Sequence, residues 1–511
     1  MLAFGCAPAR PTIDGVAGAP PSPAAPWIVP PSARTPAPTA APPISPAASV
    51  AFDKDSAATG AVRLLELPDI VDLALHNSPA TRESWEAARA AADAYGSSRG
   101  ALFPTVDASV NLLRASSSSP ANTGGAIFNG NPSDTLGGGS GNGVITGGIT
   151  RSVFTPALSL SYLVFDLGGR SGTIQTAKSR AIAANLAHNA AVSDAVLQVE
   201  STLFGFLAAR AMRDAQILAV QEAQTDTASS VERFRVGVAT LEEVLQTRTA
   251  LAQARFQLAT LEGSVLATRA NLALAMGLQA NARFDVPNVV PADSVAGVAA
   301  SVDTLVNRAI TGRPELAQAR AEADALAAQI RVARAAGYPS LTVNSTVNSV
   351  ESFRGNTGGV PLNRNFSLLL GVQIPIFSGF STQYDVRSAR EQYEAGLAHV
   401  RTVRQQISVQ VFVSYAALQT AKERVHAANE ELESALQSSD VAVGRYREGV
   451  GTVVDVVLAR RALATGRSDV IQAAWEWRTA LAQLAHDVGA LDQRGRARIP
   501  LGPAMPAGVR R

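Results

Sequence analysis

The chain repeats one series of structural elements twice. Segments about 212 residues apart each contain a predicted strand pair, a long proline-free helix, a glycine turn and a second long helix. The turn at 236–238 corresponds to the turn at 448–450, and the bend at 165–169 corresponds to the bend at 377–380. This shared order indicates an internal duplication. One strand pair and two very long helices cannot close a hydrophobic core alone.

The duplication predicts five segments. Residues 1–60 are expected to hold a signal remnant or lipid-anchor region and a Pro/Ala-rich tether, followed by a first repeat at 61–280 and a linker at 281–300. A second repeat at 301–490 precedes a C-terminal tail at 491–511. Residues 7 to about 60 contain 13 of the 28 prolines. A segment of this composition cannot bury enough apolar surface to offset the loss of chain entropy on folding. We therefore expect a semi-rigid tether without a function of its own.

Cys6 is the single cysteine of the sequence, which excludes an internal disulfide. It follows Leu-Ala-Phe-Gly at positions 2–5, which resembles the end of a bacterial lipoprotein signal. We expect Cys6 to be lipidated, with an incidental terminal cysteine as the alternative. One acyl chain alone would anchor the protein only marginally.

Composition excludes several classes of function. The net charge of +2 gives no electrostatic reason to expect a nucleic-acid partner. No uninterrupted apolar run reaches the length of a membrane-spanning helix, so contact with a bilayer would require strands or an anchor. The histidines are far apart, and we expect no metal site, no cofactor and no enzyme; they are His76, His188, His399, His426 and His486.

An alternation of period two predicts four strands, at about 105–113, 154–165, 340–350 and 366–376. One apolar face and one small polar face suit a strand between lipid and a watery lumen, although a half-buried soluble sheet gives the same pattern. The connections at 114–150 and 352–364 are polar, and the first is rich in serine, glycine and asparagine. Such loops favour membrane strands with an extracellular end.

Proline is absent from 157–286 and from 376–499, so helices are expected at about 170–235, 240–276, 381–447 and 452–488. A helix of some 65 residues is about 100 Å long, which no globular domain accommodates. Apolar residues recur every seven positions in the third helix, at Val386, Tyr393, Val400 and Ile407. This repeat predicts supercoiled helices packed side by side.

From about residue 64 to 490 the chain resembles the TolC-like outer membrane efflux factors. The resemblance is carried by Phe103-Pro104 and Tyr338-Pro339 before the outgoing strands, by the bend at 372–380, and by the turn at 445–452 with Asp455. It implies a mainly α fold with a β-barrel portion: a trimeric channel with a 12-strand outer membrane barrel and a periplasmic α-helical tunnel. Independently, four strands leave open edges that lipid does not tolerate, and three copies give twelve.

The resemblance also implies a function. The protein would be a homotrimeric, passive exit duct in outer membrane lipid, reaching into the periplasm and serving efflux or type I secretion. It would dock with a periplasmic adaptor and an inner membrane pump of the RND or ABC type. A non-conducting, periplasm-spanning coiled-coil scaffold is the alternative, and an enzyme built on helices is disfavoured because no catalytic constellation is present.

The predicted site residues lie at the two helix turns. Glycine tolerates the left-handed conformation that ends a helix, and threonine can cap the next one. We expect adaptor docking at Val236, Gly237, Val238, Thr240, Glu448, Gly449, Val450 and Thr452.

Two acids follow these turns. Glu243 and Asp455 are equivalent in the repeat, and threefold assembly would arrange them as carboxylate rings, which attract cations. The resemblance implies a gate role for Asp455, while the arginine that some members carry at the position of Gly451 is absent. Ordinary solvated coiled-coil charges are the alternative.

Overall fold

A computed structural model describes residues 12–30, 63–117, 149–287, 296–298, 300–354, 363–491 and 501–504. The chain divides into two compact units. Unit 1 comprises Met1–Gly96, Gln175–Ala327 and Arg390–Arg511, and unit 2 comprises Ser97–Ile174 and Ala328–Ala389. Each unit draws on both repeats, so the units cut across the duplication. Cys6 and most of the two predicted polar loops lie outside the described residues.

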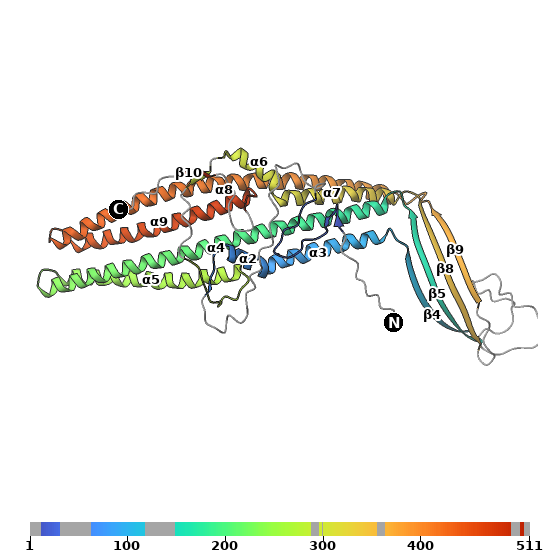
Figure 1. Ribbon diagram of the computed structural model, residues 1–511, viewed down its shortest axis with the longest axis horizontal. Helices are drawn as coiled ribbons and strands as arrows, with labels where there is room; N and C mark the ends of the chain where they lie inside the picture. The colour runs from blue at the N-terminus through green and yellow to red at the C-terminus, as the bar shows by residue number, and fades with distance from the viewer. Residues whose placement is uncertain are drawn as a thin grey trace, which may run out of the picture. The chain divides into compact units, whose positions relative to one another are not determined.

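Unit 2 contains a four-stranded antiparallel sheet in the order β4-β5-β8-β9 (Figure 1). Its strands are β4 (Thr105–Ser117), β5 (Ile149–Phe165), β8 (Ser340–Arg354) and β9 (Asn363–Gln373). The strand predicted to reach about residue 376 ends earlier, at Gln373, because Pro375 has no amide hydrogen to donate to a neighbouring strand. Within the described residues the sheet is open, since β4 and β9 each have only one partner strand.

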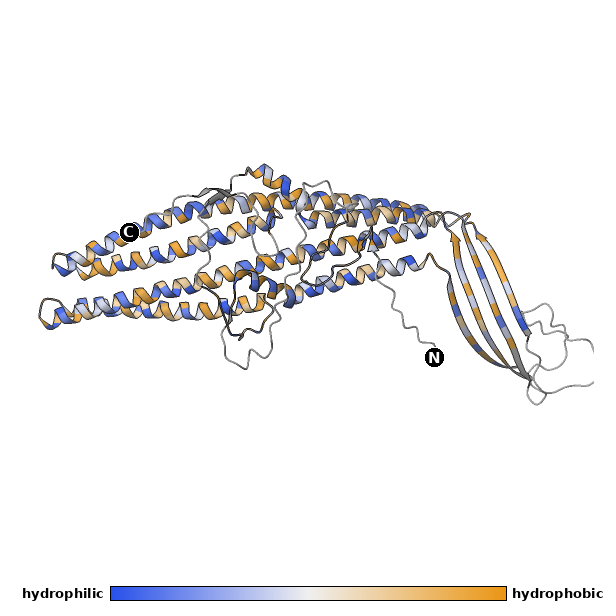
Figure 2. Cartoon of the chain, in the orientation of Figure 1, coloured by the Kyte–Doolittle hydropathy of each residue, from blue (hydrophilic) through white to orange (hydrophobic). Residues whose placement is uncertain are grey.

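The register of the sheet separates apolar from polar side chains, and the strands alternate in hydropathy (Figure 2). Directly paired residues share a face. One row across the four strands consists of Val106, Leu160, Ser345 and Leu368, and the adjacent row consists of Asp107, Ser159, Thr346 and Ser367. The apolar side chains are largely exposed, with Leu112 at 74% and Phe366 at 69%. The unit alone leaves this apolar face uncovered.

The bend between β5 and the following helix is a turn, as its sequence predicts. Leu167 and Gly168 have φ of 49° and 103°. The Asp166 carboxylate accepts the backbone N–H of Arg170 at 2.5 Å, so it satisfies the helix N-terminus where an anion could otherwise bind. The corresponding bend before α8 also has positive φ, at Gly379 and Phe380.

Eight helices of the described chain account for most of its length. They are α2 (Leu67–Asn77), α3 (Pro79–Gly100), α4 (Gly169–Arg235), α5 (Leu241–Ala275), α6 (Val302–Gly312), α7 (Pro314–Ala335), α8 (Ser381–Arg447) and α9 (Val453–Asp487). The helices α4 and α8 have 67 residues each. At 1.5 Å per residue, each is about 100 Å long. In each repeat the long helix reverses into an antiparallel partner (Figure 1).

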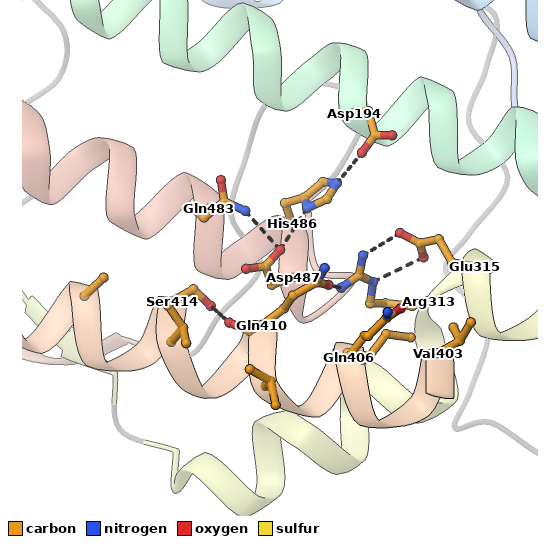
Figure 3. Close-up of a pocket in the computed structure, with 14 residues that line it drawn as sticks. Asp194, Arg313, Glu315, Val403, Gln406, Gln410, Ser414, Gln483, His486 and Asp487 are labelled. Atoms are coloured by element: carbon orange, nitrogen blue, oxygen red, sulfur yellow. Dashed lines mark hydrogen bonds and ion pairs between the residues drawn. The ribbon is translucent and has the colours of Figure 1, made fainter. Parts of the chain in front are cut away.

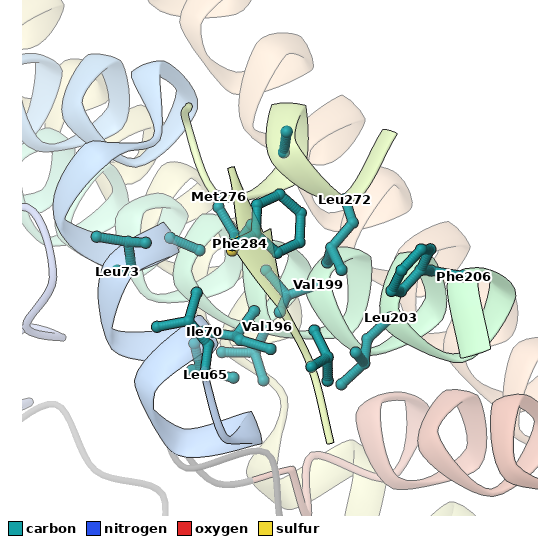
Figure 4. Close-up of a cluster of buried hydrophobic side chains, with 14 of the residues drawn as sticks. Leu65, Ile70, Leu73, Val196, Val199, Leu203, Phe206, Leu272, Met276 and Phe284 are labelled. Atoms are coloured by element: carbon teal, nitrogen blue, oxygen red, sulfur yellow. The ribbon is translucent and has the colours of Figure 1, made fainter. Parts of the chain in front are cut away.

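The two largest hydrophobic clusters described in unit 1 are centred one on each repeat. In the first, α2 contributes Ile70 and Leu73 against Val199 of α4, with Met276 and Phe284 covering them (Figure 4). In the second, Leu305 of α6 and Trp477 of α9 pack with Ile407, Val411 and Leu418 of α8. One stretch of α4 is apolar enough to span a membrane by composition, but half of it is buried within the protein, as in a core helix.

The linker and tail contain short strands. Within the linker expected at 281–300, β6 (Phe284–Asp285) pairs in parallel with β3 (Arg63–Leu64). A second short strand, β7 (Ala296–Val298), pairs with β10 (Leu501–Ala504) of the tail. Both pairs form between segments far apart in the sequence, which is why alternation within one segment did not indicate them.

Residues 12–30 do not form the extended tether expected from their composition. They begin with a hairpin of β1 (Thr12–Ile13) and β2 (Val16–Ala17). Ile13 and Trp27 are 0% and 3% exposed. A high proline content does not exclude docking onto a surface that supplies hydrogen-bond donors.

Candidate functional site: the two helix turns

The first turn joins α4 to α5 through five residues that end one helix and cap the next. Gly237 has φ of 81°, and its left-handed conformation lets Val238 N–H reach the Arg233 carbonyl at 2.9 Å. The Thr240 hydroxyl then accepts Glu243 N–H at 3.3 Å as the N-cap of α5. Val236 and Val238 remain 64% and 63% exposed, so this turn presents an apolar tip.

The second turn joins α8 to α9 in the same way. Gly449 has φ of 76°, and Val450 N–H reaches the Arg445 carbonyl at 3.0 Å. Gly451 lies against the helix end, where an added Cβ would be 3.0 Å from Arg445 Cβ. A side chain at 451 would press on Arg445 and on the backbone of Tyr446, so the turn is closely packed at this position.

Asp455 is held within its own helix cap. Thr452 Oγ1 accepts Asp455 N–H at 3.3 Å, and the Asp455 carboxylate accepts Thr452 N–H at 3.1 Å. The hydrogen bond from Thr452 N–H, and then that from the Thr452 hydroxyl, lower the pKa of Asp455 below its usual range. Its side chain is exposed and charged at the surface of the turn.

Glu243 has a different surrounding from Asp455, although the two are equivalent in the repeat. The Tyr446 hydroxyl of α8 donates to Glu243 Oε2 at 3.1 Å, and the Arg233 guanidinium lies 4.7 Å from the centre of the Tyr446 ring. Burial, followed by the hydrogen bond to Glu243, raises the pKa of Tyr446, so the phenol remains a donor. This contact joins the α8–α9 hairpin to the α4–α5 hairpin.

A group of ion pairs joins the same hairpins further along. Arg460 of α9 contacts Asp226 at 3.2 Å and Glu222 at 3.4 Å, both on α4. Arg467 of α9 contacts Glu222 at 3.0 Å. Burial raises the pKa of Asp226, and the charge of Arg460 opposes that rise. These side chains are partly shielded from water, which strengthens their pairing relative to exposed ion pairs.

A cleft of about 710 Å³ lies where α9 ends beside α8 and α4 (Figure 3). On its wall, His486 Nε2 is 2.8 Å from Asp194 Oδ1 of α4, and its Nδ1 is 3.1 Å from Asp487 Oδ1. Burial alone would lower the pKa of His486, but the two carboxylates outweigh it and raise the pKa to about 9. His486 is therefore a cation at neutral pH and joins α9 to α4.

A second polar group also lines the cleft. Arg313, which follows α6, binds Glu315 at 2.5 Å and Gln410 of α8 at 2.6 Å. These contacts hold the α6–α7 junction against α8. The charged side chains of the cleft are thus paired, and they lie beside apolar lining residues such as Val403, Ile407 and Val413.

The structure places all eight predicted turn residues at the two turns and gives the two predicted acids different partners. Sequence reasoning did not select Tyr446, Arg460, Arg467, Glu222 or Asp226. The sequence did contain a signal. Glu222 and Asp226 are four residues apart and share one face of α4, and Arg460 and Arg467 are seven apart and share one face of α9. Which face meets which depends on contacts across more than 200 residues, and local spacing does not contain that information.

Comparison with known proteins agrees with this architecture. The family model for outer membrane efflux proteins matches residues 70–278 and 305–490. Protein CyaE of Bordetella pertussis (strain Tohama I) is 26% identical over 427 residues, which cover 82% of this chain and 83% of that protein.

Solved structures share the fold at low identity. The outer membrane protein VceC of Vibrio cholerae superposes with a TM-score of 0.67 at 18% identity, covering 83% of this chain and 96% of VceC. The CmeC outer membrane channel of Campylobacter jejuni gives a TM-score of 0.68 at 18% identity, covering 83% of this chain and 85% of CmeC. With the family match spanning both repeats, the chain belongs to the outer membrane efflux protein family, the TolC-like proteins of the bacterial outer membrane.

Proposed function

We propose that the protein assembles as a homotrimer and forms the passive outer membrane exit duct of a tripartite export system. The cargo enters from a periplasmic adaptor and an inner membrane pump of the RND or ABC type, which supplies the energy. Both drug efflux and type I secretion use this arrangement. Cys6, if acylated, adds a lipid anchor to the one that the strands provide.

The four-stranded sheet is the observation that carries this proposal. Its register collects apolar side chains on one face and small polar side chains on the other, as a strand between lipid and water requires. A backbone N–H or C=O without a hydrogen bond costs roughly several kcal/mol of free energy in lipid. The free edges of β4 and β9 must therefore pair with other strands. Three copies joined edge to edge give a closed barrel of twelve strands.

The two turns supply the adaptor contact in this proposal. Val236, Val238 and Val450 are exposed by 63% to 68%, and no other described segment fills the space above Gly237 or Gly449. Apolar tips on rigid helices suit docking against a partner helix pair. The contact energy comes from these valines, while the glycines keep the turns narrow.

The contacts between the hairpins hold the duct closed at its entrance. Tyr446–Glu243, Arg460–Asp226 and Arg467–Glu222 each join a helix of one repeat to a helix of the other. Separation of the α8–α9 hairpin from the α4–α5 hairpin requires these contacts to break. Adaptor binding at the adjacent turns is placed to break them and so widen the entrance.

Two measurements on the purified protein test the proposal. Mass measurement in mild detergent should give a homotrimer, and planar bilayers should show conductance. A stable monomer would contradict barrel closure by three copies. A trimer without conductance would instead favour the coiled-coil scaffold, which needs the same helices but no pore.

A further inference from the structure

Residues 12–30, here called the strap, lie along α3 and α4 in unit 1. The strap begins at a hairpin whose turn, Asp14-Gly15, has φ of 48° and 82°, as the two-residue Asp-Gly turn favours. Asp14 Oδ1 is 2.5 Å from Lys178 Nζ of α4. The strap's Val29 packs against a small apolar cluster that includes Ala183 and Leu186. The strap is thus attached at both of its ends.

The strap is held mainly through its backbone carbonyls. A proline-rich segment lacks many amide hydrogens, and its carbonyls need donors when water is excluded. Side chains of α3 and α4 provide four donors to it: Asn185 to Gly18 O at 2.9 Å, Trp85 to Pro20 O at 3.0 Å, His188 to Ala25 O at 3.1 Å, and Asn189 to Trp27 O at 3.0 Å.

Asn189 makes the most selective of these contacts. Its Oδ1 accepts the N–H of Trp27 at 2.6 Å while its Nδ2 donates to the Trp27 carbonyl, so one amide pairs with both backbone groups of one residue. The Trp27 indole is buried and donates back to Ala17 O at 2.6 Å. The strap is therefore fixed in position along α4 and is not merely adsorbed on it.

His188 is buried in a state that suits donation. Burial lowers its pKa, and the bond to the Ala25 carbonyl opposes that shift. Its Nδ1 lies 2.9 Å from the Ser84 hydroxyl of α3, which leaves Nε2 to donate to the strap. Through His188 the strap, α3 and α4 are joined at one point.

Two of these four donors have no polar counterpart in the second repeat. The helices α4 and α8 have equal length, so the positions of Asn185 and His188 correspond to Leu397 and Val400 of α8. Both equivalents are apolar. The duplication thus gives an internal comparison: the two fully buried donors are replaced by apolar residues in the second repeat, whereas Arg401 stands at the position of Asn189.

We propose that this face of α3 and α4 is a dedicated receptor for the strap, and that docking fixes the position of Thr12, from which the chain continues toward Cys6. Six peptide units between Cys6 and Thr12 span at most about 20 Å. An undocked segment from Cys6 to Arg63 would have a root-mean-square reach of roughly 40 Å or more. Docking therefore reduces the reach of Cys6 from its attachment point by at least about half.

This shortening has a consequence for the membrane anchor. An acyl group on Cys6 would be held within about 20 Å of Thr12 and hence near the start of α4, at a fixed height on the helical body. That consequence rests on the proposed lipidation, whereas the docking of the strap does not.

Hydrogen exchange of the full-length protein in detergent tests the docking. We expect slow exchange in the 12–30 peptide of the parent, and exchange faster by about tenfold in Asn189→Leu, because two hydrogen bonds are lost. Asn185→Leu with His188→Val, which copies the second repeat, should act in the same direction. Gln224→Leu, at an exposed position of α4, is the matched control and should leave the peptide unchanged. Unprotected exchange in the parent would overturn the proposal.

A substitution in the strap controls for the possibility that the substitutions in α4 disturb the helix. Trp27→Ala leaves the receptor intact and should also speed exchange of residues 12–30. Combined with Asn189→Leu, its effect should be less than additive, because the buried indole and the two Asn189 bonds hold the same residue of the strap in place. Fully additive effects would show that the two residues act separately and would contradict the receptor. Conductance and trimer mass should not change, so this result is independent of the channel function.

Cross-linking in the assembled protein tests the position of the strap. In a Cys6→Ser background, Asp14→Cys with Lys178→Cys should be joined by a short bifunctional maleimide. Asp14→Cys with Gln224→Cys should not, because position 224 lies about 70 Å further along α4 at 1.5 Å per residue. Equal cross-linking of the two pairs would mean that the segment is a free tether.

Discussion

The Tyr446 hydroxyl donates to the Glu243 carboxylate at 3.1 Å, across 203 residues of sequence. The bond connects α8 to α5 next to both turns, and Arg233 of α4 stacks on the same ring. Three of the four long helices therefore meet at one tyrosine. A small change in its position is transmitted to both hairpins.

Tyr446→Phe removes this hydrogen bond and keeps the ring on which Arg233 stacks. If the contact helps to close the entrance, single-channel conductance in planar bilayers should rise, while the protein remains trimeric. The loss of one hydrogen bond corresponds to about 1 kcal/mol of closed-state stability. Tyr415→Phe, at a half-buried tyrosine of the same helix, should conduct like the parent. Unchanged conductance in Tyr446→Phe would show that this hydrogen bond does not help to close the entrance.

Arg460→Met should destabilise the helical body because Asp226 and Glu222 lose a shared cation. We expect a loss of roughly 1–3 kcal/mol in the free energy of unfolding, measured by denaturant titration, since a partly buried carboxylate is left without its partner. Asp226→Asn in the same chain should recover part of that loss. Arg461→Met changes the neighbouring exposed arginine and should have little effect. A double variant as unstable as the single one would contradict the pairing.

His486 makes stability depend on pH in a defined window. Its pKa is about 9 in the folded protein and 6.5 ordinarily, so its stabilising effect is complete below about pH 6.5 and is lost as pH rises through 9. At 1.36 kcal/mol per unit this is on the order of 3 kcal/mol at most, and solvent near exposed Asp194 reduces it. The thermal midpoint of the parent should fall relative to that of His486→Gln between pH 6.5 and 9. Thermal midpoints of the parent and of His486→Gln that run parallel across this window would contradict the role of His486.

Gly237→Trp or Gly449→Trp should abolish export while the trimer still forms. A Cβ at either glycine meets no atom within 4 Å, so the local cost is the left-handed backbone, about 1–2 kcal/mol. The bulky ring would obstruct the adaptor contact. Gly263→Trp, at an equally open position within α5, should export normally. Co-purification of the adaptor distinguishes lost docking from misfolding, and normal export by both turn variants would exclude the turns as the docking site.

Glu243→Gln together with Asp455→Asn should weaken the cation preference of the isolated channel without affecting assembly. The amides retain the acceptor atoms for Tyr446 and for Thr452 N–H but remove both charges. Reversal potentials in a salt gradient measure the preference. The pKa of Asp455 lies below its usual range, so in the parent its charge persists at mildly acidic pH. Glu448→Gln removes an exposed charge at the same turn, and an equal effect there would mean that the two acids have no special position.

The sequence by itself determined the features that depend on neighbouring residues. The glycine turns, the Thr240 and Thr452 caps, the strand alternation and the proline-free helices all follow from local conformational preferences, which act over a few residues. The duplication also showed the order of the elements, because the same order occurs in both repeats. The Asp14-Gly15 pair is also a local hairpin signal, although the proline content of its surroundings led us to expect a tether.

Tertiary structure decided the pairings between repeats. Asp226 meets Arg460, and Asp194 meets His486, across 234 and 292 residues. Each of these side chains has many possible partners at helical spacing, and only the relative rotation of two packed helices selects one. The same reason separates Glu243 from Asp455: equal positions in the repeat face different neighbours, because α5 lies against Tyr446 whereas Asp455 closes its own helix cap. The strap shows this most clearly, since its four carbonyls find donors that only the folded pair of α3 and α4 brings together.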